Sequence, residues 1–216
     1  MCFYVDLQFK AVELENRFDA TIEFVEDMLL EKEVKGFSFP ETPVIVDESP
    51  KVITPYYWGL IPFWSKDNNI QKYTLNAKIE TLSEKPSFRQ SVNKRCLVLV
   101  NGFYEWKWLD AKGKQKEKYR IYTPDNEPFA LAGIYSKWND PNSGQEVKTY
   151  SIITTEANKL MAEIHNTKKR MPVVLQKGDE ASWLQHEDYN FYKYPGYESK
   201  LDAEIVSPGQ AQGSLF

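Results

Sequence analysis

Apolar residues occur along most of this chain in short runs, either alternating with polar residues or continuous over about six positions, as in β-strands. Turn residues separate the runs. Gly113 divides two Lys-rich segments in a pattern typical of a hairpin, and Asn-Asp-Pro-Asn-Ser-Gly at 139–144 predicts another turn. The pattern therefore predicts mainly antiparallel strands. The expected strands are 1–9, 44–46, 95–100, 128–138, 149–154 and 170–175.

Two segments have helical spacing instead. Residues 11–34 place apolar side chains three and four positions apart, with acidic residues between them. Residues 155–165 also share one apolar face, and Thr155 can serve as the N-cap of a helix there. We therefore expect an α+β fold: one domain over 1–197, dominated by antiparallel strands with a few flanking helices, followed by a flexible tail over 198–216.

Charge is unevenly distributed along the 216 residues. The net charge is −4, yet residues 1–50 carry 4 basic and 12 acidic residues, whereas residues 66–120 carry 13 basic and 6 acidic ones. A basic middle segment can present a positive face to a polyanion, although solvated lysines such as those at 112–118 would give the same count. Aromatic residues form 14% of the chain, which suits either strand cores or a surface on which bases stack.

The two cysteines, Cys2 and Cys96, are too few for a disulfide framework and suit a reducing compartment. The first residues lack the apolar core of a signal peptide, and no apolar run approaches the roughly 20 residues of a membrane span. The sequence therefore predicts a cytoplasmic protein that does not associate with membranes. It suggests no metal site and no cofactor.

Cys2 is the position with the most distinctive chemistry. Removal of Met1, which aminopeptidases perform before small residues, would leave a 1,2-aminothiol at the start of the chain. An α-amine has a pKa of about 7.7–8.0, against about 10.4 for Lys, so part of it is nucleophilic near neutral pH. Such an amine forms a Schiff base with an aldehyde, and the neighbouring thiol can close a thiazolidine ring. The alternative is a cysteine without function in a strand.

Two further residues could transfer protons. Strand alternation places Glu105 on the same face as Phe103, where burial would raise the pKa of the carboxyl and suit it to general-acid catalysis. His165 is expected at the C-terminal end of a helix, where the helix dipole favours the imidazolium. Each residue alone has an ordinary explanation, namely a solvent-facing edge-strand Glu and a structural helix-end His.

Taken together, these segments resemble the SRAP family, the SOS response-associated peptidases, from Met1 to about Trp183. The matching segments are 1–2, 58–64, 76–81, 95–106, 129–135, 157–165 and 170–175. The resemblance implies a compact β-rich domain that binds single-stranded DNA and crosslinks abasic sites through Cys2. It also implies that Asn76 orients the amine or the sugar, that Glu105 opens the deoxyribose ring, and that His165 transfers the proton for Schiff-base formation.

The resemblance further implies that Trp64 helps to form a wedge against bases and that Lys78 contacts phosphate. The chain departs from the family at Phe3 and Tyr4, where Gly-Arg is usual, and at Lys78, where Arg is usual. An insertion before Arg170 adds two lysines that can rebuild a phosphate site. The residues expected to contact DNA are Tyr4, Trp64, Lys78, Trp106, Lys168, Lys169 and Arg170.

Two alternative functions stay open at this point. In a cysteine peptidase, Cys2 and His165 would form a dyad oriented by Asn76, and an autocatalytic version could remove Met1. A non-catalytic single-strand binder would rely on aromatic and lysine side chains. The peptidase needs only the thiol and tolerates Met1, whereas the binder tolerates Cys2→Ala.

The end of the chain carries a separate signal. Gln212, Leu215 and Phe216 follow or end a polar, Pro- and Gly-containing segment from Ser207 that we expect to be disordered. Their spacing resembles the pentapeptide with which bacterial proteins bind the replication sliding clamp. The sequence therefore suggests the clamp as a second partner besides single-stranded DNA that contains abasic sites.

Overall fold

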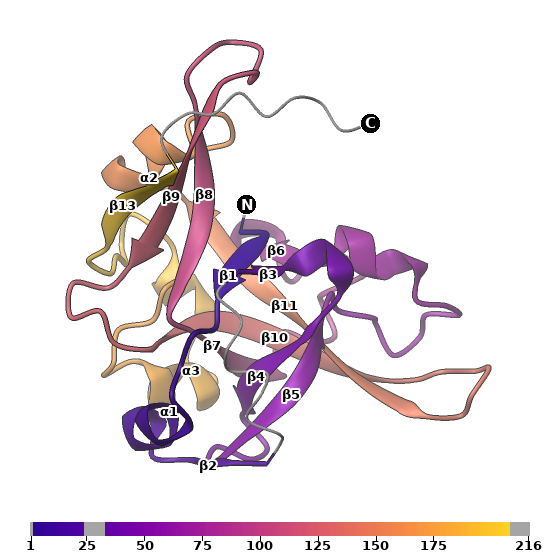
Figure 1. Ribbon diagram of the computed structural model, residues 1–216. Helices are drawn as coiled ribbons and strands as arrows, with labels where there is room; N and C mark the ends of the chain where they lie inside the picture. Colours follow the sequence, from indigo (N-terminus) through magenta and orange to yellow (C-terminus); the bar gives the residue numbers. More distant parts are fainter. Residues whose placement is uncertain (1, 24–32, 208–216) are drawn as a thin grey trace.

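Two β-sheets form the frame of the molecule (Figure 1). The computed structural model describes residues 2–23 and 33–207. Within them the smaller sheet has the strand order β13-β9-β8-β1-β3, and all neighbours are antiparallel. The bounds of its strands are β1 (Tyr4–Asp6), β3 (Val34–Lys35), β8 (Gly102–Trp108), β9 (Lys116–Tyr122) and β13 (Asp202–Ser207).

The larger sheet has the order β12-β11-β10-β7-β4-β5-β2, and β6 also pairs with β11. In this order β11 and β5 are not neighbours, but they also pair with each other in parallel. The strands β11, β10, β7, β4 and β5 therefore form a closed ring. The bounds are β2 (Thr21–Ile22), β4 (Glu41–Val46), β5 (Val52–Trp58), β6 (Asn76–Lys78), β7 (Arg95–Val100), β10 (Phe129–Asn139), β11 (Glu146–Glu156) and β12 (Arg170–Pro172).

The core of this ring is tightly packed. A methyl group at Gly133 would lie 2.7 Å from the Cys96 sulfur and 2.9 Å from a Val98 methyl, so glycine is required where β10 pairs with β7. Trp58 and Tyr150 stack within the same core, where both side chains are fully buried.

Short helices flank the sheets. These are α1 (Ala11–Phe18), α2 (Lys159–Ile164), α3 (Glu180–Leu184) and 3-10 helices at Gly36–Ser38, Asn69–Tyr73, Ile79–Thr81 and Tyr189–Tyr192. Arg17 on α1 and Glu180 on α3 form a bidentate ion pair with N–O distances of 3.1 and 2.5 Å. Such paired hydrogen bonds fix the position of α1 against α3.

The predicted α+β fold is confirmed, and the strands expected at 44–46, 95–100 and 128–138 form, the last of them from Phe129, as does the hairpin at Gly113. The helix expected at 11–34 does not run unbroken, and residues 24–32 of that prediction lie outside the described residues. Helix α1 ends at Phe18 because Asp19 adopts a left-handed conformation with φ 48°, after which β2 begins.

The helix expected at 155–165 also begins late. Thr155 belongs to β11, and Asn158 is the N-cap, its side chain accepting a hydrogen bond from the Met161 backbone N–H. The β-favouring run before Asn158 continues the strand instead.

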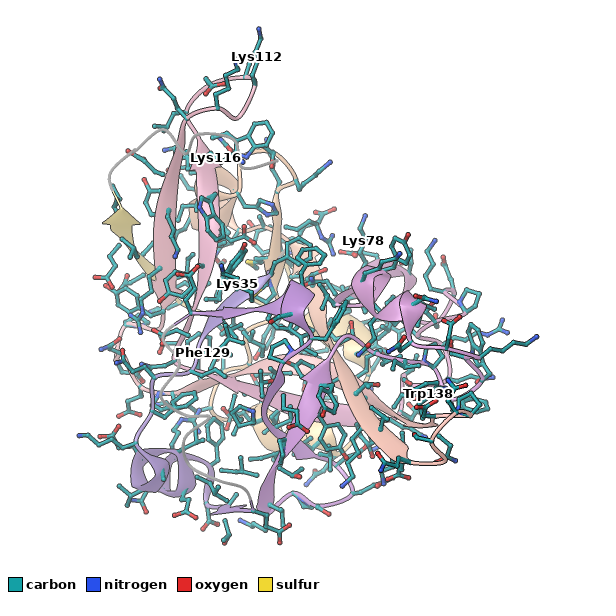
Figure 2. All side chains as sticks on the ribbon, turned by 45° about the vertical axis from the view of Figure 1, so that its right-hand side comes forward. Lys35, Lys78, Lys112, Lys116, Phe129 and Trp138 are labelled. Carbon is teal, nitrogen blue, oxygen red and sulfur yellow. The ribbon has the colours of Figure 1, made fainter. Side chains whose placement is uncertain are left out.

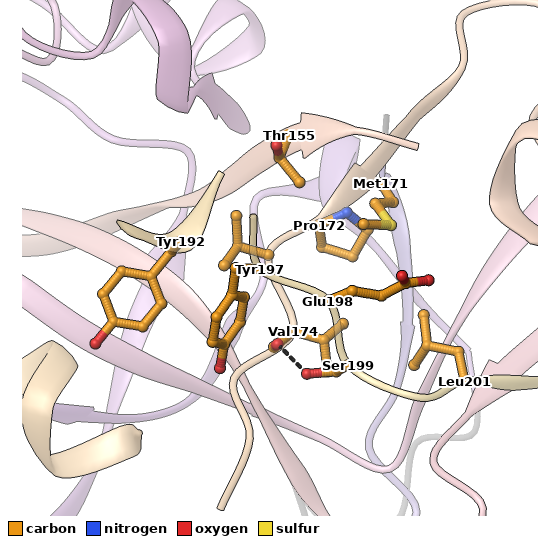
Figure 3. A pocket seen from close by; sticks show the side chains of 10 residues that line it. Thr155, Met171, Pro172, Val174, Tyr192, Tyr197, Glu198, Ser199 and Leu201 are labelled. Atoms are coloured by element: carbon orange, nitrogen blue, oxygen red, sulfur yellow. Dashed lines mark hydrogen bonds between the residues drawn. The ribbon is translucent and has the colours of Figure 1, made fainter. Parts of the chain in front are cut away.

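The ordered fold extends past Tyr197, because part of the segment expected to be a flexible tail forms β13 against β9. The Gln212, Leu215 and Phe216 signal lies outside the described residues. The segment between Tyr192 and Leu201 packs on β11 and β12 around a small cavity, where Ser199 donates a hydrogen bond to the Val174 carbonyl (Figure 3). None of the four expected catalytic residues lines this cavity.

Candidate active site

The N-terminal segment brings Cys2 to the junction of the two sheets, because Cys2 precedes β1 of one sheet and is bonded by Asn76 on β6 of the other, and its side chain is fully buried. β1 pairs with β8 through Val5 and Phe103, and this register places the start of the chain alongside Glu105. The Asn76 side-chain amide donates a hydrogen bond of 2.9 Å to the Cys2 carbonyl. The backbone of Cys2 is therefore held from a second strand, β6.

Asn76 has a fixed position because it opens β6, which pairs in parallel with β11 at Ile152. Its Nδ2 is engaged by Cys2, whereas its Oδ1 is buried and has no hydrogen-bond partner within residues 2–23 and 33–207. A buried acceptor without a partner is costly, so this oxygen is well suited to accept a hydrogen bond from an amine or a sugar hydroxyl.

Glu105 points into the buried side of β8, on the face that also carries Phe103. Burial raises the pKa of its carboxyl to about 7. A substantial fraction of Glu105 is therefore protonated near neutral pH, which is the state that a general acid requires. This is the pKa shift that the strand pattern predicts.

The Cys2 thiol also responds to this environment. Burial raises its pKa well above the ordinary range, and the nearby Glu105 carboxylate raises it further. The thiol is therefore protonated at neutral pH, unlike the thiolate of a typical cysteine peptidase.

His165 lies directly after α2, which contacts β8. Its Nδ1 is 2.8 Å from the Arg170 carbonyl, and because a carbonyl only accepts, Nδ1 carries the proton and Nε2 is the basic nitrogen. Burial lowers the pKa of His165, with a smaller contribution from Lys168. The side chain is therefore a neutral proton acceptor, contrary to the imidazolium that a helix C-terminus favours.

Asn166 is a site residue that the sequence analysis missed. Its side chain accepts a hydrogen bond of 3.1 Å from the Trp108 N–H and donates one of 2.8 Å to the Trp108 carbonyl. These bonds join the loop after His165 to the strand that carries Glu105. Only its position beside His165 could have drawn attention to it.

Four of the residues expected to contact DNA are exposed, namely three lysines close in sequence to Asn76 and His165, and Trp64 in a separate loop. Lys78 ends β6, two residues after Asn76, and Lys168 and Lys169 lie in the loop that follows His165. In Figure 2, Lys78 lies in the upper half of the view, as do Lys112 and Lys116 of the hairpin. Trp64 is 48% exposed in a loop fixed by a 2.7 Å hydrogen bond from Trp138 to the Ser65 carbonyl.

The remaining expected DNA contacts are already engaged by other groups. Trp106 packs edge-on against Tyr4 with 4.7 Å between ring centroids, and the Lys118 ammonium lies 5.5 Å from the Trp106 ring. Arg170 forms two 2.8 Å hydrogen bonds with the Glu80 carboxylate. Arg170 would therefore have to exchange this partner in order to bind a phosphate.

Across residues 2–23 and 33–207, no group of three or more His, Cys, Asp or Glu side chains is arranged to hold a metal ion. The helices in the same ranges are all too short or too polar to span a membrane.

Comparison with protein families identifies the chain. A profile described as SOS response associated peptidase (SRAP) matches residues 1–207. The chain belongs to the SRAP family. The resemblance seen in the sequence is thus confirmed over nearly the whole of this SRAP chain.

Similar proteins carry a consistent description. The SRAP chain is 47% identical over 142 residues to the abasic site processing protein YoqW of Bacillus subtilis, covering 65% of this chain and 61% of that protein. It is 34% identical over 162 residues to the abasic site processing protein HMCES of Xenopus tropicalis, covering 64% and 46%. The chain thus aligns with less than two thirds of the length of these relatives.

Solved structures share the fold. A crystal structure of a protein from Bacteroides thetaiotaomicron is 36% identical, with a TM-score of 0.86, covering 95% of the SRAP chain and 92% of that protein. A second, from Bordetella bronchiseptica, has a TM-score of 0.81 at 20% identity, covering 96% and 100%. The latter likeness concerns the fold alone.

Proposed function

We propose that this chain captures abasic sites in single-stranded DNA by a covalent bond to Cys2, exposed by removal of Met1. One observation carries the proposal: Cys2 is held by Asn76 beside a buried Glu105 whose carboxyl has a pKa of about 7. The names of the relatives, abasic site processing proteins, agree with it. Protection of damaged DNA during replication would follow from such capture.

The reaction begins on the sugar. An abasic deoxyribose is mainly a closed ring, and protonation of the ring oxygen by Glu105 opens it to the C1′ aldehyde. The Cys2 amine attacks this carbon, and loss of one water gives a Schiff base. The thiol then adds to the same carbon and passes its proton to the imine nitrogen, so the thiazolidine forms without a further leaving group.

Three further residues assist the amine in this reaction. His165 is neutral with Nε2 as its basic nitrogen, so it can take the proton that the attacking amine loses. The Asn76 Oδ1 accepts a hydrogen bond from the amine and orients its lone pair. The two hydrogen bonds between Asn166 and Trp108 tie the loop after His165 to β8. They therefore hold His165, the base, in a fixed position relative to Glu105, the acid.

Cysteine peptidase activity is less well supported by the site. A peptidase needs a thiolate, and both burial and Glu105 raise the pKa of the Cys2 thiol. A non-catalytic binder would leave the arrangement of Cys2, Asn76 and Glu105 without a role. Peptidase chemistry is therefore confined, in this proposal, to the removal of Met1, by this chain or by an aminopeptidase.

The direct test is intact-mass spectrometry of mature protein mixed with single-stranded DNA that contains one abasic site. We expect one adduct with the mass of protein plus DNA less one water, stable without borohydride. Peptide mapping should place it on the N-terminal peptide. DNA of the same sequence without the abasic site is the control. Absence of the adduct on the abasic oligonucleotide contradicts the proposal.

DNA binding should depend on Lys78, which is exposed and lies two residues beyond Asn76. Each phosphate contact to a single strand contributes about 0.7 to the slope of log K against log salt. Lys78→Ala should therefore lower that slope by about 0.7 in anisotropy titrations between low and moderate salt.

The matched control is Lys10→Ala, because the Lys10 side chain is 78% exposed and precedes α1, which lies at the lower left of the molecule, away from β6 (Figure 1). This variant should retain the slope. An equal slope for Lys78→Ala and the unmodified protein would exclude Lys78 from the DNA path.

A further inference from the structure

Two phenylalanines lie beside Cys2 and have no part in the chemistry above. Phe3 directly follows Cys2, and its ring centroid is 4.9 Å from that of Phe37, with an angle of 37° between the ring planes. Phe37 is 56% exposed and lies in the 3-10 helix Gly36–Ser38. We call Phe3 and Phe37 together the aromatic shelf.

The aromatic shelf is fixed relative to the site. The Gly36 N–H donates a 2.8 Å hydrogen bond to the Phe3 carbonyl, one residue after the Cys2 carbonyl that Asn76 holds. Gly36 itself packs on the Trp58 ring, since a methyl group there would lie 3.2 Å from three of its carbons. The shelf is therefore supported by the core.

We propose that the aromatic shelf stacks the nucleobase next to the abasic site; this inference rests on the proposed function. An abasic site removes one base from the strand, so its neighbour loses a stacking partner on that side. An aromatic side chain can replace that partner, because every base has a π-face.

Charge around the shelf favours a nucleic acid as its occupant. Lys35 is exposed beside Gly36 and pairs in register with Tyr4, and Lys78 is exposed beyond Asn76 (Figure 2). These two lysines, one on the strand paired with β1 and one on the strand whose Asn76 holds Cys2, can contact the phosphates that flank the lesion. The surface area of two aromatic rings is also far smaller than the roughly 800 Å² that each partner buries in a typical protein–protein interface. A single base is the occupant that matches this size.

The test compares single-turnover crosslinking at limiting protein on three oligonucleotides. In each oligonucleotide, both nucleotides that flank the abasic site are adenine, thymine or an unreactive tetrahydrofuran analogue. Stacking should make the protein react about tenfold faster beside adenine than beside tetrahydrofuran, with thymine between them. Phe37→Ala should abolish this difference while leaving the rate beside tetrahydrofuran unchanged. Phe37→Leu, which retains apolar area, should behave like Phe37→Ala.

The control is Val12→Ala, because Val12 is 57% exposed on α1, far from the chain start in Figure 1. It should keep the preference for adenine. A preference for adenine that Phe37→Ala retains, or equal rates beside all three neighbours, would overturn the inference while leaving the proposed function intact.

A binding measurement tests the shelf even without crosslinking. An oligonucleotide with 2-aminopurine beside a tetrahydrofuran site changes its fluorescence when that base stacks on an aromatic ring. The unmodified protein should change this fluorescence at saturation, and Phe37→Ala should not. Equal changes with both proteins contradict the inference. Lack of any covalent adduct with reactive DNA contradicts instead the proposed function.

Discussion

We expect Cys2→Ser to lose the stable crosslink entirely and to leave a Schiff base that survives only after borohydride reduction. The α-amine is retained, so the first bond still forms, but a hydroxyl closes a less stable ring than a thiol does. An additional residue before Cys2 should abolish both products, because the amine is then an amide. Denaturing gels with and without borohydride distinguish the three outcomes.

The second cysteine supplies the matched control for this experiment. Cys96 is also fully buried, and its sulfur packs against Gly133 in the core. Cys96→Ala should lower stability through the small cavity it creates, yet it should form the crosslink at the normal rate. A stable adduct formed by protein that retains a residue before Cys2 would refute the amine mechanism.

Glu105→Gln should have the second largest effect. The amide retains the size of the carboxyl but cannot donate an acidic proton, so crosslinking to a natural, mainly ring-closed abasic site should slow by about 10²–10⁴-fold. On an open-chain aldehyde in the same DNA, the loss should be much smaller, because no ring needs opening. Equal slowing on both substrates would exclude Glu105 from ring opening.

The pH profile gives an independent check on Glu105. Its carboxyl has a raised pKa of about 7, so the rate on ring-closed DNA should fall as pH rises through 7, and Glu105→Gln should lack this decline. Burial favours the protonated carboxyl, so its contribution to stability is complete below the ordinary pKa of 4.5 and is lost as pH rises through 7. Glu105→Gln should therefore be at least as stable as the unmodified protein at pH 8, which thermal unfolding measures.

Strand content was predictable from sequence because burial on one or both faces imposes a visible pattern, as in 95–100 and 128–138. The closure of the larger sheet was not, because Tyr57 and Thr149 pair in parallel across more than ninety residues, and only the packed tertiary structure selects them. The two helices were overextended because local breaks decide their ends. Asp19 leaves the helical conformation, and Asn158 caps α2 later than Thr155 would.

The chemistry of the site was more accessible than its geometry. Cys2 and Glu105 attract attention by residue type and position alone, and the raised pKa of Glu105 follows from its strand face. Asn166 and Phe37 were missed because their contacts join segments distant in sequence, namely a loop with β8 and a 3-10 helix with the first residues. No local pattern encodes such contacts.

The place of β1 inside its sheet has a mechanical consequence. This three-residue strand lies between β8 and β3 and begins two residues after Cys2. A DNA strand joined to Cys2 would be joined to the end of β1, so tension on the DNA would run along the strand. Such tension loads the backbone hydrogen bonds to both neighbours at once, in shear, and the Asn76 bond to Cys2 shares the load. A crosslink at Cys2 would therefore resist tension on the DNA.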